Sequence, residues 1–258
     1  MIIRNTLTYS LILLGVMFSQ CGSSFKPDRE DEINGIKILF TVPMPIDSNH
    51  IQQVSDSIFV FFYKNYTAYK IPYMHTYNII EVDKSGKMVG QRSTPEIRYK
   101  YFCYKDSNSF GMRYDSSSAR TGTKISVDSF LATYGVGTFA LPKNYQDMYL
   151  LTNSTINADR LVQKYIARNI VDPQSYDSIY LYFSDKFNKI PFSIAKGKDR
   201  FDQKKLTKIR YLFNSKYDIE HSIIMLKREI GLEMQKINII ENHNEINGIF
   251  RKLTDEMK

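Results

Sequence analysis

The chain has 258 residues, of which 43% are hydrophobic and 24% charged, and its formal net charge at pH 7 is +8. This composition is that of a globular protein with ample material for a core, and it excludes an intrinsically disordered chain. The sequence contains 19 Tyr and 16 Phe but no Trp. Because Tyr and Phe favour strands, the composition predicts a β-rich protein.

The N-terminal stretch has the features of a signal peptide that ends at a cysteine. Arg4 precedes an apolar run at residues 7–18, which is too short to cross a hydrocarbon core of about 30 Å as a helix. The sequence Phe18-Ser19-Gln20-Cys21 follows directly. This stretch resembles the lipobox of bacterial lipoproteins, in the relaxed form found among Bacteroidota, although Phe18 and Gln20 depart from the commoner pattern.

The resemblance implies that residues 1–20 are a removable signal peptide and that Cys21 carries lipid. Acyl chains on Cys21 would anchor the protein to a membrane of the cell envelope, expected to be the outer membrane. The other interpretation is an ordinary secretory peptide, or a buried helix, with a chance cysteine. Lipidation would leave Cys103 as the only free thiol, and we expect it to be buried in a strand.

Residues 21–34 are expected to be a flexible tether. They are rich in Ser, Lys, Asp and Glu, and residues 28–32 read DREDE. An acidic run soon after a lipidated cysteine resembles the export signal of Bacteroidota surface lipoproteins. Because the run begins later than in that pattern, both a periplasmic and a surface-exposed position stay open.

The remaining sequence predicts an α+β, β-rich fold with mainly antiparallel sheets and a C-terminal helix. Two β-rich units are expected, one at 35–145 and one at 146–258. Strands or hairpins are predicted at 36–40, 57–63, 77–90, 97–104 with 110–115, 178–184, 209–213 and 228–239, with a turn at 43–45 and a helix at 161–170. In the C-terminal helix, the apolar spacing places Ile246, Ile249, Phe250 and Leu253 on one side, with Asn244 as the N-cap.

An internal echo suggests that the two units are similar. Residues 56–62 read DSIFVFF and residues 177–183 read DSIYLYF; KIPY at 70–73 and KIPF at 189–192 follow, and then IRY at 97–99 and 209–211. Tandem duplication and chance resemblance among aromatic strands are both compatible with this order. The DSI triplets also resemble the O-glycosylation pattern of Bacteroidota periplasmic proteins, which makes Ser57 and Ser178 candidate acceptors.

The sequence carries no motif of a known catalytic or cofactor site. It has no glycine-rich phosphate loop, no HExxH, no GxSxG and no paired-cysteine metal spacing, and its four histidines share no motif. We therefore predict no cofactor, no metal and no catalytic residue. The leading hypothesis is a non-enzymatic binding or interaction module, and the alternative is a lipid-tethered enzyme whose site is assembled from residues distant in sequence.

A basic segment at residues 186–210 is the best-defined candidate interaction site, because it contains nine basic residues and only two aspartates. Its function would be to bind an anionic glycan, a lipid or an envelope protein; otherwise it is a solvated face. Nucleic acid is not expected as a partner of an exported lipoprotein, and the run shows no aromatic interleaving of the RNA-binding kind. The cations are Lys186, Lys189, Lys196, Lys198, Arg200, Lys204, Lys205, Lys208 and Arg210.

Overall fold

The computed structural model describes residues 33–47, 49–134, 145–157, 160–168, 175–195, 198–218 and 221–256. The predicted signal peptide, Cys21, most of the predicted tether and Lys196 lie outside these ranges. Residues 33–258 form one compact unit. In the described part of the chain, no helix is long and apolar enough to cross a membrane.

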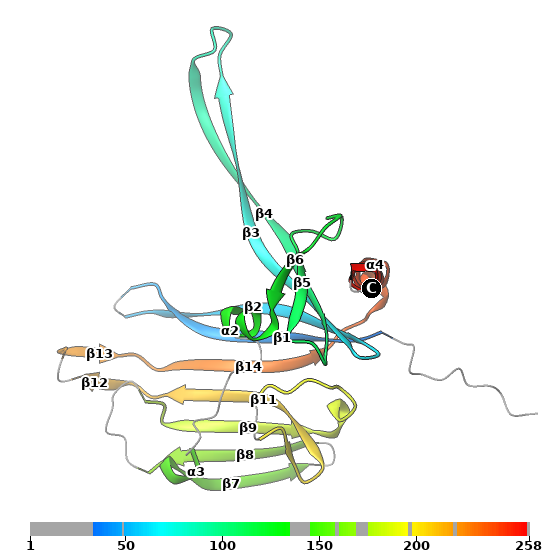
Figure 1. The fold of residues 1–258 in the computed structure, drawn as a ribbon. Helices are drawn as coiled ribbons and strands as arrows, with labels where there is room; N and C mark the ends of the chain where they lie inside the picture. Colours follow the sequence, from blue (N-terminus) through cyan, green and yellow to red (C-terminus); the bar gives the residue numbers. More distant parts are fainter. Residues whose placement is uncertain are drawn as a thin grey trace, which may run out of the picture. The chain divides into compact units, whose positions relative to one another are not determined.

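The predicted β-rich α+β fold is confirmed. Twelve strands form one antiparallel sheet in which the order is β6-β5-β4-β3-β2-β1-β14-β11-β9-β8-β7, with β10 paired to β11, and β12 and β13 form a separate hairpin (Figure 1). The strands are β1 (Asn34–Pro45), β2 (Ile51–Tyr63), β3 (Tyr66–Val82), β4 (Met88–Lys105), β5 (Phe110–Tyr114), β6 (Thr123–Ser126), β7 (Tyr149–Asn157), β8 (Arg160–Ala167), β9 (Ser178–Ser184), β10 (Arg200–Phe201), β11 (Lys204–Phe213), β12 (Lys216–Asp218), β13 (Ile223–Met225) and β14 (Arg228–Lys236). The helices are α2 (Val127–Tyr134), α3 (Tyr145–Met148) and α4 (His243–Glu256), with short 3-10 turns η2 (Asp185–Phe187) and η3 (Ile240–Asn242).

Residues 34–126 supply one half of this sheet, and residues 149–236 supply the other half. β1 to β6 follow one another from the centre outward, and β7, β8, β9, β11 and β14 run back from the opposite edge to the centre. The halves meet where β1 pairs with β14, over residues 36–41 and 231–236. The chain therefore returns to the middle of the sheet to complete it.

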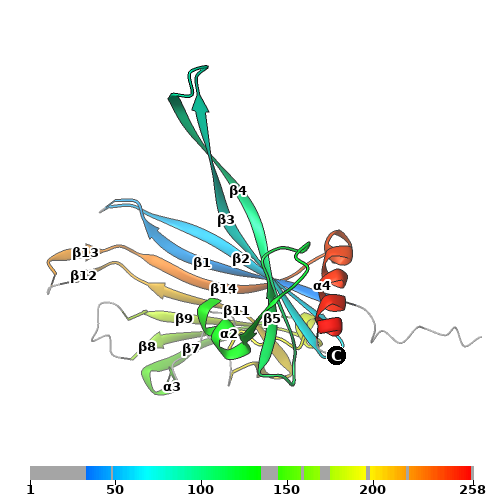
Figure 2. The same ribbon diagram turned by 45° about the horizontal axis from the view of Figure 1, so that its top comes forward.

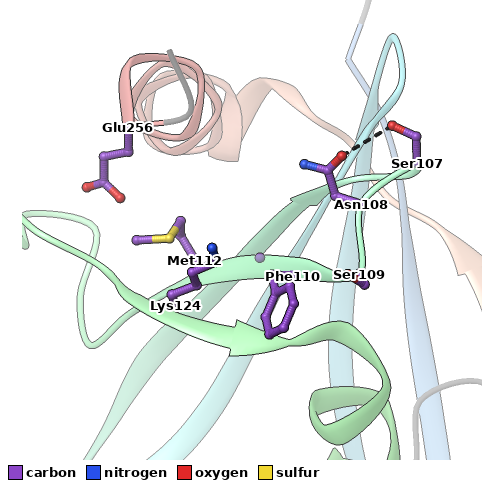
Figure 3. Close-up of a pocket in the computed structure, with 8 residues that line it drawn as sticks. Ser107, Asn108, Ser109, Phe110, Met112, Lys124 and Glu256 are labelled. Carbon is purple, nitrogen blue, oxygen red and sulfur yellow. Dashed lines mark hydrogen bonds between the residues drawn. The ribbon is translucent and has the colours of Figure 1, made fainter.

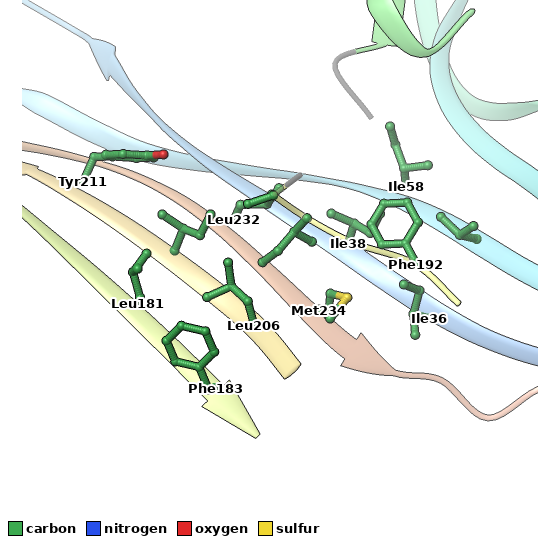
Figure 4. Packing of buried hydrophobic residues seen from close by; sticks show 14 of the residues in the cluster. Ile36, Ile38, Ile58, Leu181, Phe183, Phe192, Leu206, Tyr211, Leu232 and Met234 are labelled. Atoms are coloured by element: carbon green, nitrogen blue, oxygen red, sulfur yellow. The ribbon is translucent and has the colours of Figure 1, made fainter. Parts of the chain in front are cut away.

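Each face of the sheet supports its own apolar cluster, because alternate side chains of a strand point to opposite faces. On β2, Val60 joins the larger cluster together with Phe192 and Ile194 of the loop after η2. Figure 4 shows part of this cluster, with Phe192 close to Ile38. The neighbouring Phe61 joins the smaller cluster, which α4 covers (Figure 2). The α4 side chains in that cluster are those that the helical spacing predicted: Ile246, Ile249, Phe250 and Leu253.

Three local predictions are wrong, each for a tertiary reason. Residues 161–170 were expected to be helical, but β8 occupies 160–167 because it is paired on both sides, by β7 and β9. The predicted turn at 43–45 belongs to β1, whose residues beyond Thr41 pair only with β2, so that Pro43 and Pro45 lie where strand prolines are tolerated. Asn244 is not the N-cap, because α4 begins one residue earlier, after η3.

The echoed segments do not occupy equivalent places. DSIFVFF lies in β2 and DSIYLYF in β9, and both are strands as predicted. Pro72, however, lies inside β3 opposite Tyr99, whereas Pro191 lies outside the strands. The first IRY segment is in β4, which β3 separates from β2, but the second is in β11, which pairs directly with β9. The matching sequence segments thus do not correspond to a repeated strand arrangement.

Candidate functional site

The basic segment does not form a single free patch. On β11, Lys208 donates to Glu233 Oε2 at 2.6 Å, and Arg210 holds both oxygens of Glu229 at 2.6 Å. The Arg210 guanidinium, by these hydrogen bonds, lowers the pKa of the Glu229 carboxyl. These two cations are therefore neutralised by carboxylates of β14, the neighbouring strand.

Lys205 is buried rather than displayed. Its side chain is only 4% exposed, and its ammonium donates to the Ile190 carbonyl at 2.6 Å and lies 3.5 Å from Asp199. Burial lowers the pKa of Lys205, and Asp199 opposes that shift. The role of Lys205 is thus to fasten the loop after η2 to β11. Arg200 supports the same loop by donating to the Asn188 carbonyl at 3.0 Å.

Two other members of the basic segment do converge, and they do so with a lysine that the sequence analysis missed. Lys186 and Lys189 line a pocket of about 590 Å³, together with Lys236 at the end of β14. We call this site the basic pocket. Asp185 is the only acidic residue among its described lining residues, and Asn34, Gly35, Asn188, Ile190, Ile237 and Ile239 complete the lining.

The local backbone explains why the lysines converge. Backbone bonds from Asn188 N to the Asp185 carbonyl and from Ile190 N to the Phe187 carbonyl continue the 3-10 geometry of η2. In that geometry residues three apart lie on the same side, so Lys186 and Lys189 share one side of the turn. The Lys236 ammonium lies 5.8 Å from the ring centre of Phe187, which brings the third cation to the same turn.

Gly35 allows β1 to pack closely against Ile237 and Phe61 at this pocket. A Cβ atom at residue 35 would lie 2.9 Å from Ile237 Cδ1 and 3.0 Å from the Phe61 ring. Glycine therefore allows Ile237 to close the apolar side of the basic pocket. The pocket thus lies at the start of β1, where the described chain begins.

A second pocket, of about 440 Å³, is a groove between the end of α4 and the β4–β5 turn. Phe110 and Met112 of β5 form its floor, while Lys124 of β6 and Glu256 of α4 line its sides (Figure 3). Glu256 also accepts hydrogen bonds from the Tyr114 hydroxyl at 3.2 Å and from Gly122 N at 3.3 Å. Its described lining residues include one cation and one carboxylate, so together they offer no net charge to a ligand.

A polar cluster fastens α4 to the sheet, and we call it the clamp. Lys70 of β3 donates to Glu245 Oε2 at 2.7 Å and to Asn242 Oδ1 at 2.9 Å, and its ammonium lies 4.4 Å from the Tyr99 ring centre. The Tyr101 hydroxyl donates to the other oxygen of Glu245. Burial and the adjacent Glu245 carboxylate raise the pKa of Tyr101, so the phenol remains protonated. Every member of the clamp is thus already paired within the protein.

The remaining candidates carry no assembled site in the described residues. Cys103 is buried in β4 as predicted, and burial raises the pKa of its thiol. Within the described ranges, no group of three His, Cys, Asp or Glu side chains could hold a metal ion. Ser57 is half-buried in β2, and Ser178 is buried in β9, so Ser57 is the more accessible of the two predicted glycosylation acceptors.

Exposed apolar side chains gather on a long hairpin. β3 pairs with β4 from Tyr66 to Val82, but β2 covers only residues 66–70 of β3, and β5 covers only residues 101–103 of β4. Residues 73–98, here called the arm, therefore extend beyond their neighbours as a two-stranded ribbon (Figures 1 and 2). Exposed apolar side chains of the arm are Met74, Tyr77, Ile79, Ile80, Val82, Met88, Val89 and Ile97.

The arm has its own stabilising contacts. At its tip, Asp83 Oδ1 accepts from Ser85 N at 2.8 Å and from Lys87 N at 3.0 Å, and Gly86 supplies the positive φ of 80° that the turn requires. Farther down, the Arg98 guanidinium lies 4.9 Å from the Tyr77 ring centre. The hairpin and its Ser85–Gly86 turn were predicted from the sequence and are confirmed.

Comparison with known proteins identifies no family. No protein-family model matches the sequence, and no curated protein matches it. Two solved structures show weak similarity. The LolA superfamily protein NE2245 from Nitrosomonas europaea is 10% identical, with 81% of this chain and 87% of that chain covered and a TM-score of 0.21. The ywiB protein from Bacillus subtilis is 10% identical, with coverages of 80% and 94% and a TM-score of 0.14. Likenesses at these TM-scores carry no argument about function.

Proposed function

We propose that the protein is a lipid-anchored binding module of the cell envelope, attached through Cys21, and that its basic pocket receives a phosphate-bearing anionic group. The observation that carries the proposal is the convergence of Lys186, Lys189 and Lys236 on one pocket, in whose described lining Asp185 is the single carboxylate. Three ammonium groups around one anion give a strong and salt-sensitive attraction.

The position of the pocket suggests where the anion comes from. Asn34 and Gly35 line the pocket, and Ile33 follows Cys21 by twelve residues. An extended chain of that length reaches at most about 40 Å. If Cys21 is lipidated, the pocket is therefore held within reach of the membrane surface, and an anionic phospholipid headgroup is the anion nearest to it. The alternative, a tethered enzyme, stays a prediction.

The anchor is tested at Cys21. Replacing Cys21 with serine is expected to abolish lipid attachment, because a hydroxyl cannot form the thioether. Metabolic labelling with a radioactive fatty acid in a bacterial host, followed by detergent phase separation, measures the result. The variant should lose the label and leave the detergent phase as an unprocessed or soluble product. A processed Cys21→Ser protein that still partitions into detergent would contradict the anchor.

The pocket is tested on the chain from residue 22 onward, which retains every described contact because all of them lie within residues 33–256. Binding is measured by co-sedimentation with phosphatidylcholine vesicles that contain about 30% of the anionic lipid phosphatidylglycerol. The triple variant Lys186→Glu, Lys189→Glu and Lys236→Glu should bind about a hundredfold more weakly, since each basic residue near such a surface contributes about 1 kcal/mol.

A matched variant separates the pocket from net charge. Lys84→Glu, Lys87→Glu and Arg92→Glu make the same charge change on the arm, where all three side chains are exposed. This control should lose far less affinity than the pocket variant. Free glycerol phosphate distinguishes a soluble phosphate from a lipid headgroup, because a site for soluble phosphate would be blocked by millimolar competitor. Equal losses in the two variants would refute the pocket.

A further inference from the structure

The two edges of the arm differ in their protection against pairing with another strand. The β4 edge carries Arg92, Pro95, Glu96 and Arg98. Charged side chains and proline on an edge strand are the usual means by which proteins prevent further strand addition. The β3 edge, by contrast, reads YMHTYNII over residues 73–80, without Asp, Glu, Lys, Arg or Pro.

The unprotected edge is also the one that exposes apolar side chains in an uninterrupted β-forming segment. Met74 is 71% exposed and Ile80 is 59% exposed, and Tyr77 and Ile79 between them are exposed as well. Segments of six or seven residues with high β propensity, no charge and no proline readily accept a further strand. Beyond residue 70, β3 has only β4 as a neighbour in the described sheet.

We propose that the β3 edge of the arm, residues 73–80, pairs antiparallel with the same edge of a second copy of this chain. Identical edges meet their own charges when they pair about a two-fold axis, so an edge with net charge repels itself. The β3 edge has no such charge between residues 73 and 80, and a second copy can therefore approach without repulsion. The β4 edge would bring Arg92 and Arg98 against a second positively charged edge.

A two-fold axis at Tyr77 fits the side chains. It keeps every residue on its own face of the ribbon and places Met74 of one copy opposite Ile80 of the other. The two exposed apolar side chains would then cover each other, which removes surface that the single arm leaves in water. Anchored copies, as proposed above, would be confined to one membrane surface, which raises their effective concentration.

The test uses the full chain in detergent, with sedimentation equilibrium over a range of concentrations. Asn78 and Ser93 are cross-strand partners that share one hydrogen bond of 2.8 Å, so replacing either residue with lysine loses the same internal contact. Asn78→Lys places two like charges at the proposed β3–β3 pairing and should weaken the dimer by about tenfold or more. Ser93→Lys places the charge on the β4 edge and should leave the dimer intact.

Crosslinking supplies a second readout. In a Cys21→Ser background, a short bismaleimide should join two copies of an Asn78→Cys variant and leave a Ser93→Cys variant uncrosslinked. Cys103, the remaining native thiol, is silent because it is buried. Circular dichroism confirms that the variants remain folded. The proposal is overturned if the parent chain is monomeric at every concentration, if both lysine variants dissociate equally, or if Asn78→Lys dimerises like the parent. Because vesicle binding uses the basic pocket, failure here leaves the proposed function unaffected.

Discussion

Replacing Gly111 with alanine is expected to destabilise the folded protein by about 2 to 3 kcal/mol. Gly111 is buried in β5, beneath the groove, and a Cβ atom there would lie 2.6 Å from the Cys103 carbonyl oxygen and 2.6 Å from the Phe102 ring. One of these neighbours is backbone and the other is a fully buried ring, so neither can move without disturbing the β4–β5 pairing. The chain has no Trp, so urea unfolding monitored by circular dichroism measures the loss of stability.

Gly248 provides the matched control for this substitution. It lies inside α4, and nothing lies within 4 Å of a Cβ atom built on it. Gly248→Ala should therefore raise the free energy of unfolding by about 0.5 to 1 kcal/mol, because alanine loses less backbone entropy in a helix. Equal effects at the two glycines would show that the close packing at Gly111 is not what determines its cost.

Replacing Lys70 with methionine is expected to cost about 2 to 3 kcal/mol and to loosen α4. The Lys70 side chain is 11% exposed and that of Glu245 is 27% exposed, so the substitution leaves a partly buried carboxylate without its cation. Urea unfolding should report the loss, and hydrogen exchange should locate it first in α4. Arg98→Met removes the exposed pair with Glu96 and the contact with the Tyr77 ring, and should cost no more than about 1 kcal/mol.

A double-mutant cycle distinguishes the ion pair from lost packing. Glu245→Gln removes the negative charge while preserving the shape of the side chain. When it is combined with Lys70→Met, the double variant should be more stable than the sum of the two losses by about 1 kcal/mol or more, because no charge is then left unpaired. Additive losses would mean that Lys70 contributes through its aliphatic stem and the Tyr99 ring alone.

Local chemistry made the hairpins and the last helix predictable. Ser85 and Gly86 between two β-forming runs identified the tip of the arm, and the spacing of Ile246, Ile249, Phe250 and Leu253 identified the buried side of α4. The helix predicted at residues 161–170 was wrong because Leu161, Val162, Tyr165 and Ile166 also fit a helical stripe. Leu161, Gln163 and Tyr165 instead alternate into the interior of the sheet. The strands on both sides of β8 decide its structure, and they are not visible in the local pattern.

The candidate site depended on contacts between strands that the sequence does not display. The basic segment looked continuous, yet Glu229 and Glu233 of β14 pair with Arg210 and Lys208 because their strands are neighbours in the sheet. For the same reason Lys236, outside the segment, joins Lys186 and Lys189 in the basic pocket. The clue that could have found it is Lys236, the one lysine within the predicted strand at 228–239, three residues before the end of that strand.

The pairing of β1 with β14 has a consequence for how the protein reaches its native state. Ile36 must find Lys236 across almost the whole described sequence, so the central ladder of the sheet has a high contact order. During synthesis the N-terminal strands emerge first, so the edge of β1 that pairs with β14 stays exposed until β14 has been synthesised. Folding should therefore be slow, and the six-strand N-terminal intermediate should be the species most prone to aggregate.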